Sequence, residues 1–456
     1  MQPFAFAFLL ALSTAGLAHA GGVDRYVSML GNDSGNDCFV PASPCRTIQH
    51  AAGLSGSNDY VLVAAGTHTE AAVLEAPIDL EIQGGWDETF TTNDGTTVWR
   101  SKGIRPLTVI YENASGSLAV RGMTFAKSSQ QADADPDTQQ GGAIYLRASG
   151  AADARLVIDG SVLTGNKAEA GGAVAVIAEG GALTELSLLA STVSKNKAFA
   201  CGAVLIDAID SPPTEVLFRD VTFEKNKATT QGGAACLSVT DATGTQKSQQ
   251  IIRSQFLSNK AESGGALVAV VIEGGRLDPE VEASVFLRNR SVTGGGIAAF
   301  SIAGPANLAA ELNLTTTNNT FSGNRAKLFG AGTLAVALVS PTDGATTAAA
   351  THTSTNDIVF GNSGGDAVVF AEPGTSATLE RQYGIFGELG NFGGSIVDGP
   401  GLLAVDPLLV KPGKDPHLQA DSPAIDAGSC AEAATQDFEG DFFPVDIDCD
   451  IGADEF

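Results

Sequence analysis

Four acidic residues in the middle of the chain are the first candidates for chemistry. Asp207 and Asp210 precede the turn at Pro212-Pro213, and Asp220 and Glu224 follow within the next strand-like stretch. Two carboxylates held at a set separation can act as acid and base on a glycosidic bond. Acidic residues beside a turn are more commonly solvated or cap the backbone, so catalysis is the rarer role for these four.

A second acidic group is Asp133, Asp135 and Asp137, which alternate with other residues before the first clear repeat. Alternating carboxylates can hold Ca²⁺, which makes Ca²⁺ the one cofactor that the sequence suggests. No glycine or closing glutamate completes a known calcium loop, so a solvated acidic loop is the more common explanation of this pattern.

Other catalytic signatures are missing from the sequence. Four histidines follow residue 20, and they are scattered without metal-ligand spacing: His50, His68, His352 and His417. No segment indicates a Ser-His-Asp triad or a phosphate-binding loop.

A basic residue recurs about every thirty residues, each time directly after an asparagine. The column consists of Lys167, Lys197, Lys227, Lys260, Arg290 and Arg325. Like charges stacked about 4.8 Å apart repel one another. The column is therefore a solvated edge, or acids such as Glu169, Glu224 and Glu262 neutralise it. A track for an acidic glycan or for lipopolysaccharide phosphates is the functional interpretation; inheritance with the repeat is the more common one.

The basic column belongs to a sequence repeat that occurs six times between Gly141 and Phe329. Self-similarity at a fixed period indicates a stacked repeat architecture. The copies open at Gly141-Gly142-Ala143, Gly171-Gly172-Ala173, Cys201-Gly202-Ala203, Gly232-Gly233-Ala234, Gly264-Gly265-Ala266 and Gly294-Gly295-Gly296.

Each copy closes on an asparagine three residues after a large apolar residue. These asparagines are Asn166, Asn196, Asn226, Asn259, Asn289 and Asn324, and Asn362 follows after a longer interval. Kept in register, their amides form a ladder in which each side chain hydrogen-bonds its neighbours above and below.

The segments inside each copy favour strands over helices, because apolar and β-branched residues alternate in runs such as 173–177 and 183–189. Three short strands per copy make one coil of a parallel β-helix. Residues aligned on the glycines form two apolar columns on one face of their strand, which must be the inside of the coil. Residues 345–354, rich in Ala and Thr, are expected to form a loop or irregular coil.

Six cysteines in an exported chain indicate disulfides. Cys38 with Cys45 and Cys430 with Cys449 are close in sequence and lie outside the repeats, so we expect them to bridge. Cys201 and Cys236 are four residues out of register between adjacent copies. Four residues of extended strand span about 13 Å, beyond the reach of a disulfide, which predicts two separate packed thiols.

The chain divides into four regions. Met1 to Ala20 is expected to be a secretory signal, with an apolar run and an Ala18-His19-Ala20 cleavage site. Residues 21–90 form an N-terminal cap and first strands, residues 91–400 the β-helix, and residues 401–456 a C-terminal cap. No later stretch is apolar enough to span a bilayer.

The chain is strongly acidic, with 52 Asp and Glu against 26 Lys and Arg and a net charge of -26. This charge argues against nucleic acid and anionic membrane surfaces as partners. It suits an exported protein that meets divalent cations or basic partners.

Three sets of motifs resemble known families. The N-terminal motifs, Tyr26-Val27-Ser28 and residues 61–70 (VLVAAGTHTE), resemble the start of pectate-lyase-like right-handed β-helices. The Gly-Gly-Ala openings with Phe-x-x-Asn closings resemble the repeats of chlamydial-type polymorphic outer membrane proteins. Residues 422–428 (SPAIDAG) and 449–455 (CDIGADE) resemble the choice-of-anchor Q domain of bacterial surface proteins.

The resemblance implies an all-β, right-handed, single-stranded parallel β-helix with three-strand coils and caps at both ends, of about ten coils and about 50 Å. It also implies secretion or display at a bacterial cell surface, and no defined activity. The expected function is a structural, adhesive or glycan-binding role, with polysaccharide or other envelope components as partners. The alternative is a lyase or hydrolase acting on an acidic polysaccharide. The Asp-Asp and Gly-His-Gly segments of polygalacturonase-type enzymes are missing from the chain.

Overall fold

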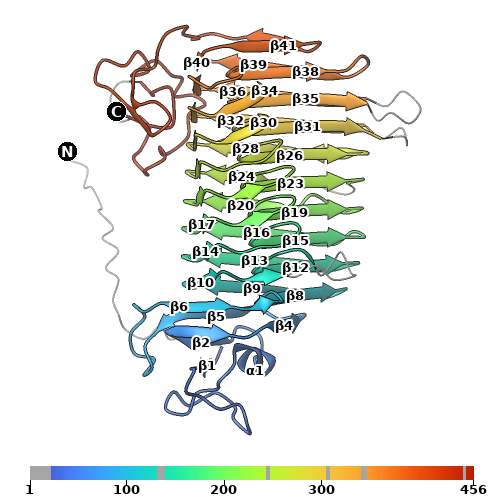
Figure 1. Cartoon of the computed structure of the whole chain (residues 1–456), viewed down its shortest axis with the longest axis vertical. Coiled ribbons are helices and arrows are strands. Elements are labelled where there is room, and N and C mark those ends of the chain that lie inside the picture. The colour runs from blue at the N-terminus through green and yellow to red at the C-terminus, as the bar shows by residue number, and fades with distance from the viewer. Residues whose placement is uncertain (1–21, 131–138, 243–246, 305–308, 340–346, 445–447) are drawn as a thin grey trace, which may run out of the picture.

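The computed structural model describes residues 22–130, 139–242, 247–304, 309–339, 347–444 and 448–456. Its strands wind into three long parallel sheets, and the fold is a right-handed parallel β-helix, as expected (Figure 1). The expected signal segment lies outside the described residues. No helix in the described part of the chain is long and apolar enough to cross a membrane.

The first sheet contains, in spatial order, β1 (Asp24–Val27), β2 (Tyr60–Ala64), β5 (Leu80–Trp86), β9 (Ser115–Arg121), β13 (Asp153–Asp159), β16 (Leu183–Leu189), β20 (Glu215–Arg219), β24 (Gln249–Ile252), β28 (Pro279–Glu282), β32 (Ala310–Thr317), β36 (Ala348–Thr355), β39 (Ser376–Gln382) and β42 (Ser395–Asp398), and β27 (Gly275–Leu277) also pairs with β32. The second sheet contains β3 (Gly66–Thr69), β6 (Thr97–Arg100), β10 (Met123–Ala126), β14 (Val162–Thr164), β17 (Thr192–Ser194), β21 (Thr222–Glu224), β25 (Gln255–Leu257), β29 (Val285–Leu287), β33 (Thr320–Ser322), β37 (Ile358–Phe360) and β40 (Ile385–Phe386).

The third sheet contains β4 (Ala72–Glu75), β8 (Leu107–Glu112), β12 (Ile144–Ser149), β15 (Val174–Glu179), β19 (Val204–Ile209), β23 (Ala235–Thr240), β26 (Leu267–Ile272), β31 (Ile297–Ala303), β35 (Thr333–Val339), β38 (Ala367–Ala371) and β41 (Leu389–Phe392). Four short pairs complete the set: β7 (Lys102–Gly103) with β11 (Ser129–Gln130), β18 (Lys197–Ala198) with β22 (Lys227–Ala228), β30 (Arg290–Thr293) with β34 (Arg325–Phe329), and the antiparallel β43 (Leu409–Lys411) with β44 (Asp415–Leu418).

The core runs along the axis of the helix and is built from equivalent residues of successive coils. Ile144, Val174 and Val204 pair in register and are fully buried. The phenylalanines that close the middle copies stack face to face, with centroid separations of 4.8, 4.5 and 4.6 Å along Phe223, Phe256, Phe286 and Phe321. Alternation therefore placed the inward columns correctly, and the aromatic column adds stacking to apolar burial.

The two positions of each glycine pair favour glycine for different structural reasons. The first position of the pair has a left-handed backbone, which Cys201 also adopts at φ +55°. The second position lies against the next coil: a Cβ on Gly172 would sit 2.3 Å from the carbonyl oxygen of Gly202. The first site therefore tolerates another residue at some cost in strain, whereas the second requires glycine.

The expected asparagine ladder is present in the structure. The Nδ2 of Asn166, Asn196, Asn226, Asn259 and Asn289 each donates to the Oδ1 of the next asparagine at 3.0 to 3.1 Å. The same oxygens accept the backbone N–H of the preceding asparagine, so the ladder amides are satisfied by adjacent coils. The ladder continues through Asn324 to Asn362.

A second ladder occupies the corner between the first and second sheets. Ser254 donates its backbone N–H to the hydroxyl of Ser284, whose own N–H donates to Asn319 Oδ1. Asn319 then donates to Asp357 from both its N–H and its Nδ2, at 2.7 and 3.0 Å. This ladder contains serine, asparagine and aspartate, so no single residue type recurs at its positions in the sequence.

The structure contains three disulfides. Cys38–Cys45 and Cys430–Cys449 pair as expected. Cys201 and Cys236 also pair, with their Cα atoms 5.5 Å apart, so the prediction of two separate thiols was wrong. The error lies in treating the segment after Cys201 as extended strand, when it is a tight turn. A Cβ on Gly232, the counterpart of Cys201, would lie 2.4 Å from the sulfur of Cys236.

A second difference concerns residues 345–354, which were expected to form a loop. Ala348–Thr355 is β36, an eight-residue strand in the first sheet. β36 lies between β32 and β39, and over residues 348–353 its buried and partly exposed positions alternate as in the neighbouring strands.

The short helix α1 (Ile48–Gly53) closes the N-terminal end of the core. Ile48, Ala51 and Ala52 are buried in the continuous apolar core. The hydroxyl of Thr47 accepts the N–H of His50, and the carboxylate of Glu70 accepts the N–H of Ile48 at 3.0 Å. These bonds satisfy the exposed end of the helix.

Residues 401–444 and 448–456, called here the C-terminal clasp, lie along the flank of the upper coils (Figure 1). Their apolar side chains pack on the outer face of the second sheet in two clusters: Val285 and Leu287 with Phe438 and Ala453, and Ile358 and Ile385 with Leu409, Leu418, Ala424 and Ile451. The amides of Asn318 and Asn356, both at left-handed corners, hydrogen-bond the clasp backbone.

The ladder predicts that one internal asparagine contributes far more to the stability of the fold than its exposed neighbour does. We expect Asn226→Ala to lower the free energy of unfolding by about 3 kcal/mol or more, since it removes the acceptor of the Asn196 backbone N–H and the donor to Asn259 Oδ1 and Val193 O. Guanidinium unfolding with the disulfides intact measures this. Lys227→Ala, one residue away and exposed, is the control. Equal effects of the two substitutions would refute the role given to the ladder.

A buried acid and a buried histidine at the top of the second ladder predict opposing pH dependences. Burial raises the pKa of Asp357 to about 6, against hydrogen bonds from Ser354, Thr316 and Asn319. Burial lowers the pKa of His352 to about 4. The fold therefore favours protonated Asp357, a stabilisation lost as pH rises through about 6, and neutral His352, a stabilisation lost as pH falls through about 4.

Removing one group should expose the effect of the other. We expect His352→Leu to become more stable, and Asp357→Asn less stable, as the pH is lowered from about 7 to about 4, each by about 3 kcal/mol relative to the unmodified chain. Leucine matches Leu314 and Leu379, the register partners of His352. Unfolding midpoints across this pH range give the measurement, and profiles parallel to that of the unmodified chain would contradict the assignment.

Candidate anion-binding surface

The six basic residues that follow the ladder asparagines form a straight, exposed column. Parallel bridges join each one to the next, from Lys167 through Lys197, Lys227, Lys260 and Arg290 to Arg325. The backbone N–H groups of the last five donate to the carbonyl oxygen of the asparagine one coil below at 2.8 to 3.0 Å, and that of Lys167 donates to Ser128 O at 3.0 Å. The spacing of the side chains is therefore fixed by the backbone, and the column extends over about 24 Å.

A second basic column runs beside the first and was not recognised from the sequence. Lys127, Lys195, Lys225 and Arg288 each stand one residue before the ladder position, at a corner where φ lies between +55° and +57°. Glycine or serine occupies this corner in the other coils. The signal in the sequence is a basic residue on both sides of the asparagine, as in Lys195-Asn196-Lys197. The two columns together are called here the basic ribbon.

The basic ribbon concentrates positive charge on a strongly acidic protein. Its ten residues are drawn from only 26 Lys and Arg in the chain, and all ten are exposed. Of the acids expected to neutralise them, Glu224 pairs with Lys225. Within the described residues, the six members of the first column form no ion pair. The ribbon is thus a cationic surface largely free to bind an external anion.

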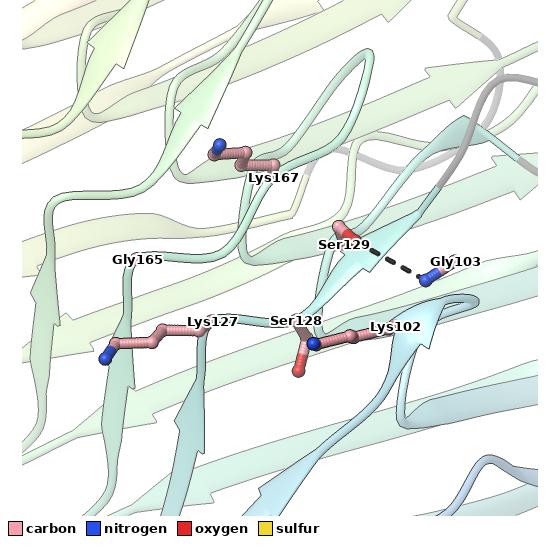
Figure 2. A pocket seen from close by; sticks show the side chains of 7 residues that line it. All are labelled: Lys102, Gly103, Lys127, Ser128, Ser129, Gly165 and Lys167. Carbon is pink, nitrogen blue, oxygen red and sulfur yellow. Dashed lines mark hydrogen bonds between the residues drawn. The ribbon is translucent and has the colours of Figure 1, made fainter.

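An open hollow of about 610 Å³ lies at the lower end of the ribbon. Lys102, Lys127 and Lys167 border it, and Figure 2 shows their ammonium groups pointing in the same general direction. Its floor is held by the hydroxyl of Ser129, which accepts the N–H of Gly103 at 3.4 Å. Three cations around one hollow form a suitable seat for a carboxylate, sulfate or phosphate.

The four acidic candidates lie on different faces of the helix. Asp207 is on β19 in the third sheet, and Asp210 follows that strand at a left-handed corner. Asp220 stands at the corner before β21 and pairs with Arg253 at 2.8 and 2.9 Å. Glu224 ends β21 in the second sheet. Asp220 and Glu224 are thus placed away from Asp207, each beside a cation.

Asp207 has the properties of a poised acid. Burial raises the pKa of its carboxyl, the Ser238 hydrogen bond opposes this rise, and the charge of Glu179 adds to it. Its Oδ1 is buried without a hydrogen-bond partner in the described structure. Arg147, which pairs with Glu179 at 2.8 Å, lies two strands away on the same outer face. The flanking positions are apolar and form a buried cluster.

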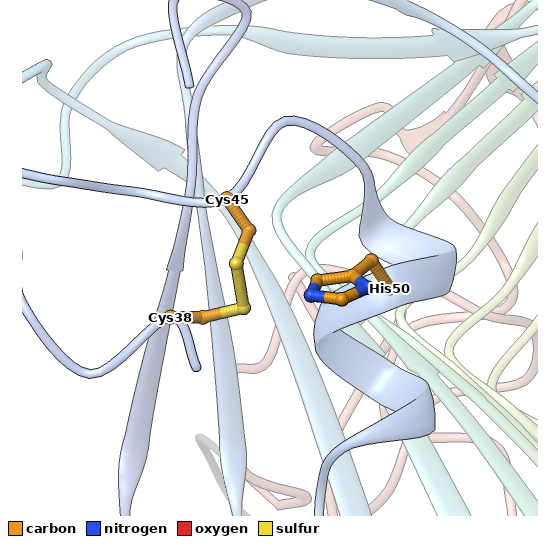
Figure 3. Close-up of side chains that lie close together, drawn as sticks. All are labelled: Cys38, Cys45 and His50. Carbon is orange, nitrogen blue, oxygen red and sulfur yellow. A yellow bond between two sulfur atoms is a disulfide. The ribbon is translucent and has the colours of Figure 1, made fainter. Parts of the chain in front are cut away.

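The expected calcium ligands Asp133, Asp135 and Asp137 lie outside the described residues. The fold does gather two other groups of metal-ligating residues. In one, His50 faces Cys38 and Cys45, whose sulfurs are bonded to each other and so occupied (Figure 3). The other unites His417, Glu439 and Asp454 in the clasp. Sequence spacing did not indicate this second group, because its members come from three separate segments.

Two comparisons with known proteins give matches. The model of the Chlamydia polymorphic membrane protein repeat matches residues 220–238, the stretch that contains Phe223, Asn226 and Gly232-Gly233. Among solved structures, the crystal structure of pectate lyase Pel9A is 12% identical and covers 95% of this chain and 96% of its own, with a TM-score of 0.35. No curated protein matches the sequence.

The ribbon predicts a small stability gain when one of its charges is removed. Lys227 lies between Lys197 and Lys260, so we expect Lys227→Gln to raise the free energy of unfolding by about 0.5 kcal/mol at low ionic strength. The gain should vanish in about 1 M salt, where the Debye length is short. Lys414→Gln in the clasp, outside the ribbon, is the control. A loss of stability at low salt would show that the charge serves the fold instead.

Proposed function

We propose that this protein is a non-enzymatic β-helix protein, secreted or displayed at a bacterial surface, that binds acidic polysaccharide along the basic ribbon. The observation that carries the proposal is the ribbon itself: ten exposed cations in two registered columns on a chain of net charge -26. Repeated like charge costs stability, so its presence over six coils favours a role in binding.

The chemistry of the ribbon favours a long, regularly charged ligand. The cations recur at every coil in fixed register, and an acidic polysaccharide carries carboxylates or sulfates at regular intervals along an extended chain. Each exposed contact contributes little, about 0.2–1 kcal/mol. Affinity therefore depends on several rungs acting together, which suits adhesion to a polymer better than recognition of a small ion.

The acidic remainder of the surface assists selectivity. Any polyanion that approaches away from the ribbon meets negative charge, which repels it. Binding is thus directed to one flank, with the hollow bordered by Lys102, Lys127 and Lys167 as its lower end. The bacterial envelope supplies the acidic glycans and phosphates that such a surface would bind.

A carbohydrate-active lyase or hydrolase is the second candidate, and Asp207 is the observation that favours it. A buried carboxyl with a raised pKa beside an Arg147–Glu179 pair is a plausible acid or base on an acidic sugar.

The deciding experiment measures binding and cleavage together. Dextran sulfate and polygalacturonate are immobilised, neutral dextran serves as the matched control, and release of reducing or unsaturated ends is followed with and without Ca²⁺. We expect salt-sensitive binding to both polyanions without cleavage. Lys197→Gln/Lys227→Gln should weaken binding about tenfold, and Arg155→Gln/Arg276→Gln, two exposed arginines on the first sheet, should not.

Binding that the ribbon substitutions leave unchanged would overturn the proposal. Cleavage that Asp207→Asn abolishes would replace it with the enzymatic function. Equal binding to neutral dextran would show that charge is not what the surface recognises.

A further inference from the structure

The C-terminal clasp brings one histidine and two carboxylates from three separate segments to one point. His417 lies on β44, Glu439 in the turn 437–441, and Asp454 two residues before the end of the described chain. Their ligand atoms all lie within 4.8 Å of one another. Nothing in the basic ribbon or in its proposed function involves these residues.

The backbone around the group fixes each of its members. Phe438 donates its N–H to Ala453 O at 2.9 Å, which places Glu439 and Asp454 one residue beyond the same pair. Leu418 donates its N–H to Asp454 Oδ2 at 2.7 Å, which sets Asp454 against the residue next to His417.

The turn that carries Glu439 is built around one carboxylate. Asp437 Oδ1 accepts the backbone N–H groups of Glu439, Gly440 and Asp441 at 2.9, 2.7 and 2.8 Å. Asp437 is therefore engaged in holding the turn, and Glu439 is left with its carboxylate facing the imidazole.

The distances suit a small cation between the three groups. His417 Nε2 lies 3.0 Å from Glu439 Oε2 and 3.8 Å from Asp454 Oδ1. Ligands bound to Zn²⁺ at about 2.0–2.2 Å stand about 3.4 Å from one another in a tetrahedral site. The observed separations lie on both sides of that value, so small side-chain movements would complete the site.

A second carboxylate orients the imidazole from behind. Asp415 Oδ1 lies 2.5 Å from His417 Nδ1. A carboxylate at Nδ1 holds the proton there and directs the Nε2 lone pair toward the other two ligands. This carboxylate–histidine–metal arrangement is the usual support of a metal-binding histidine.

The charge around the group also calls for a cation. Asp454 is only 4% exposed, and its Oδ1 faces the group. In the described part of the chain, His417 is the one basic group within ion-pair distance of Asp415, Glu439 or Asp454. Lys411 acts on Asp415 from further away, and Arg253, near Asp437, is already paired with Asp220.

We propose that His417, Glu439 and Asp454 bind a divalent transition-metal ion, with Zn²⁺ as the best match. One imidazole and two carboxylates leave a position for water, as in sites of the His–carboxylate type. Ca²⁺ fits poorly, because it takes six to eight oxygen ligands and does not favour nitrogen. The ion would link β44, the turn 437–441 and the C-terminal residues, and so stabilise the folded clasp.

The test is calorimetric titration of the folded chain, disulfides intact, with Zn²⁺ alone, and with Ca²⁺ in a parallel arm. We expect one Zn²⁺ per chain and a rise in the melting temperature. His417→Gln should weaken binding about 100-fold, and Asp415→Asn, behind the imidazole, about tenfold. Asp421→Asn, an exposed acid of the same clasp, should leave binding unchanged.

Glu439→Gln keeps the test decisive if His417→Gln fails to fold, since this side chain is half-exposed and its turn is held by Asp437. Absence of Zn²⁺ binding would overturn the proposal and leave a protonated imidazole among carboxylates as the explanation of the geometry. Binding that survives both His417→Gln and Glu439→Gln, or a preference for Ca²⁺, would also overturn it. Polysaccharide binding is measured separately and is not affected by these outcomes.

Discussion

The buried asparagines at the corners of this β-helix find most of their hydrogen-bond partners in the coils directly above and below, because those coils are their nearest neighbours. The asparagine ladder shows the consequence most plainly. Asn226 Oδ1 accepts two bonds from Asn196, and its Nδ2 donates to Asn259 and to Val193 O. One coil out of register would leave several such groups unpaired, at about 1–3 kcal/mol each. This requirement explains why the ladder asparagines recur at regular intervals in the sequence.

The same requirement explains how the ladders end. Asp366 Oδ1 accepts both the N–H and the Nδ2 of Asn362, and its Oδ2 accepts the N–H of Glu388. Asp357 closes the second ladder in the same way above Asn319. A carboxylate accepts without needing to donate onward, so it terminates a chain of amides. Burial raises the pKa of both carboxyls, which is the cost of placing an acid there.

Much of this architecture could be predicted from the sequence, because register repeats the same residue types at the same intervals. The core columns and the asparagine ladder follow from alternation and spacing alone. The second ladder was not predicted because Ser284, Asn319 and Asp357 have the same structural role but are different residue types. The Cys201–Cys236 bridge was missed because a turn was treated as a strand, and strand β36 because alanine and threonine carry little signal.

The site was less predictable than the fold. The first basic column was visible, and the second could have been found from Lys195 and Lys225, which precede the ladder asparagines. Whether a column is neutralised depends on side-chain directions, which spacing does not give. The group at His417 depends on the clasp folding against the flank. The sequence gives little sign of this contact, because the outward column of the second sheet that carries Val285 and Ile358 beneath the clasp also carries Val162 in a lower coil and Thr320 between them.

The position of the clasp determines where the molecule can change its length in evolution. Its contacts bind together the coils from Arg253 to Ile385, so a coil duplicated or lost among these would pull the two surfaces out of alignment. Below them, the copies between Gly141 and Asp220 have no such partner on the second sheet in the described structure. A whole repeat can be gained or lost there, provided the Cys201–Cys236 bond still joins adjacent rungs. The lower half can thus act as an adjustable spacer beneath a fixed head.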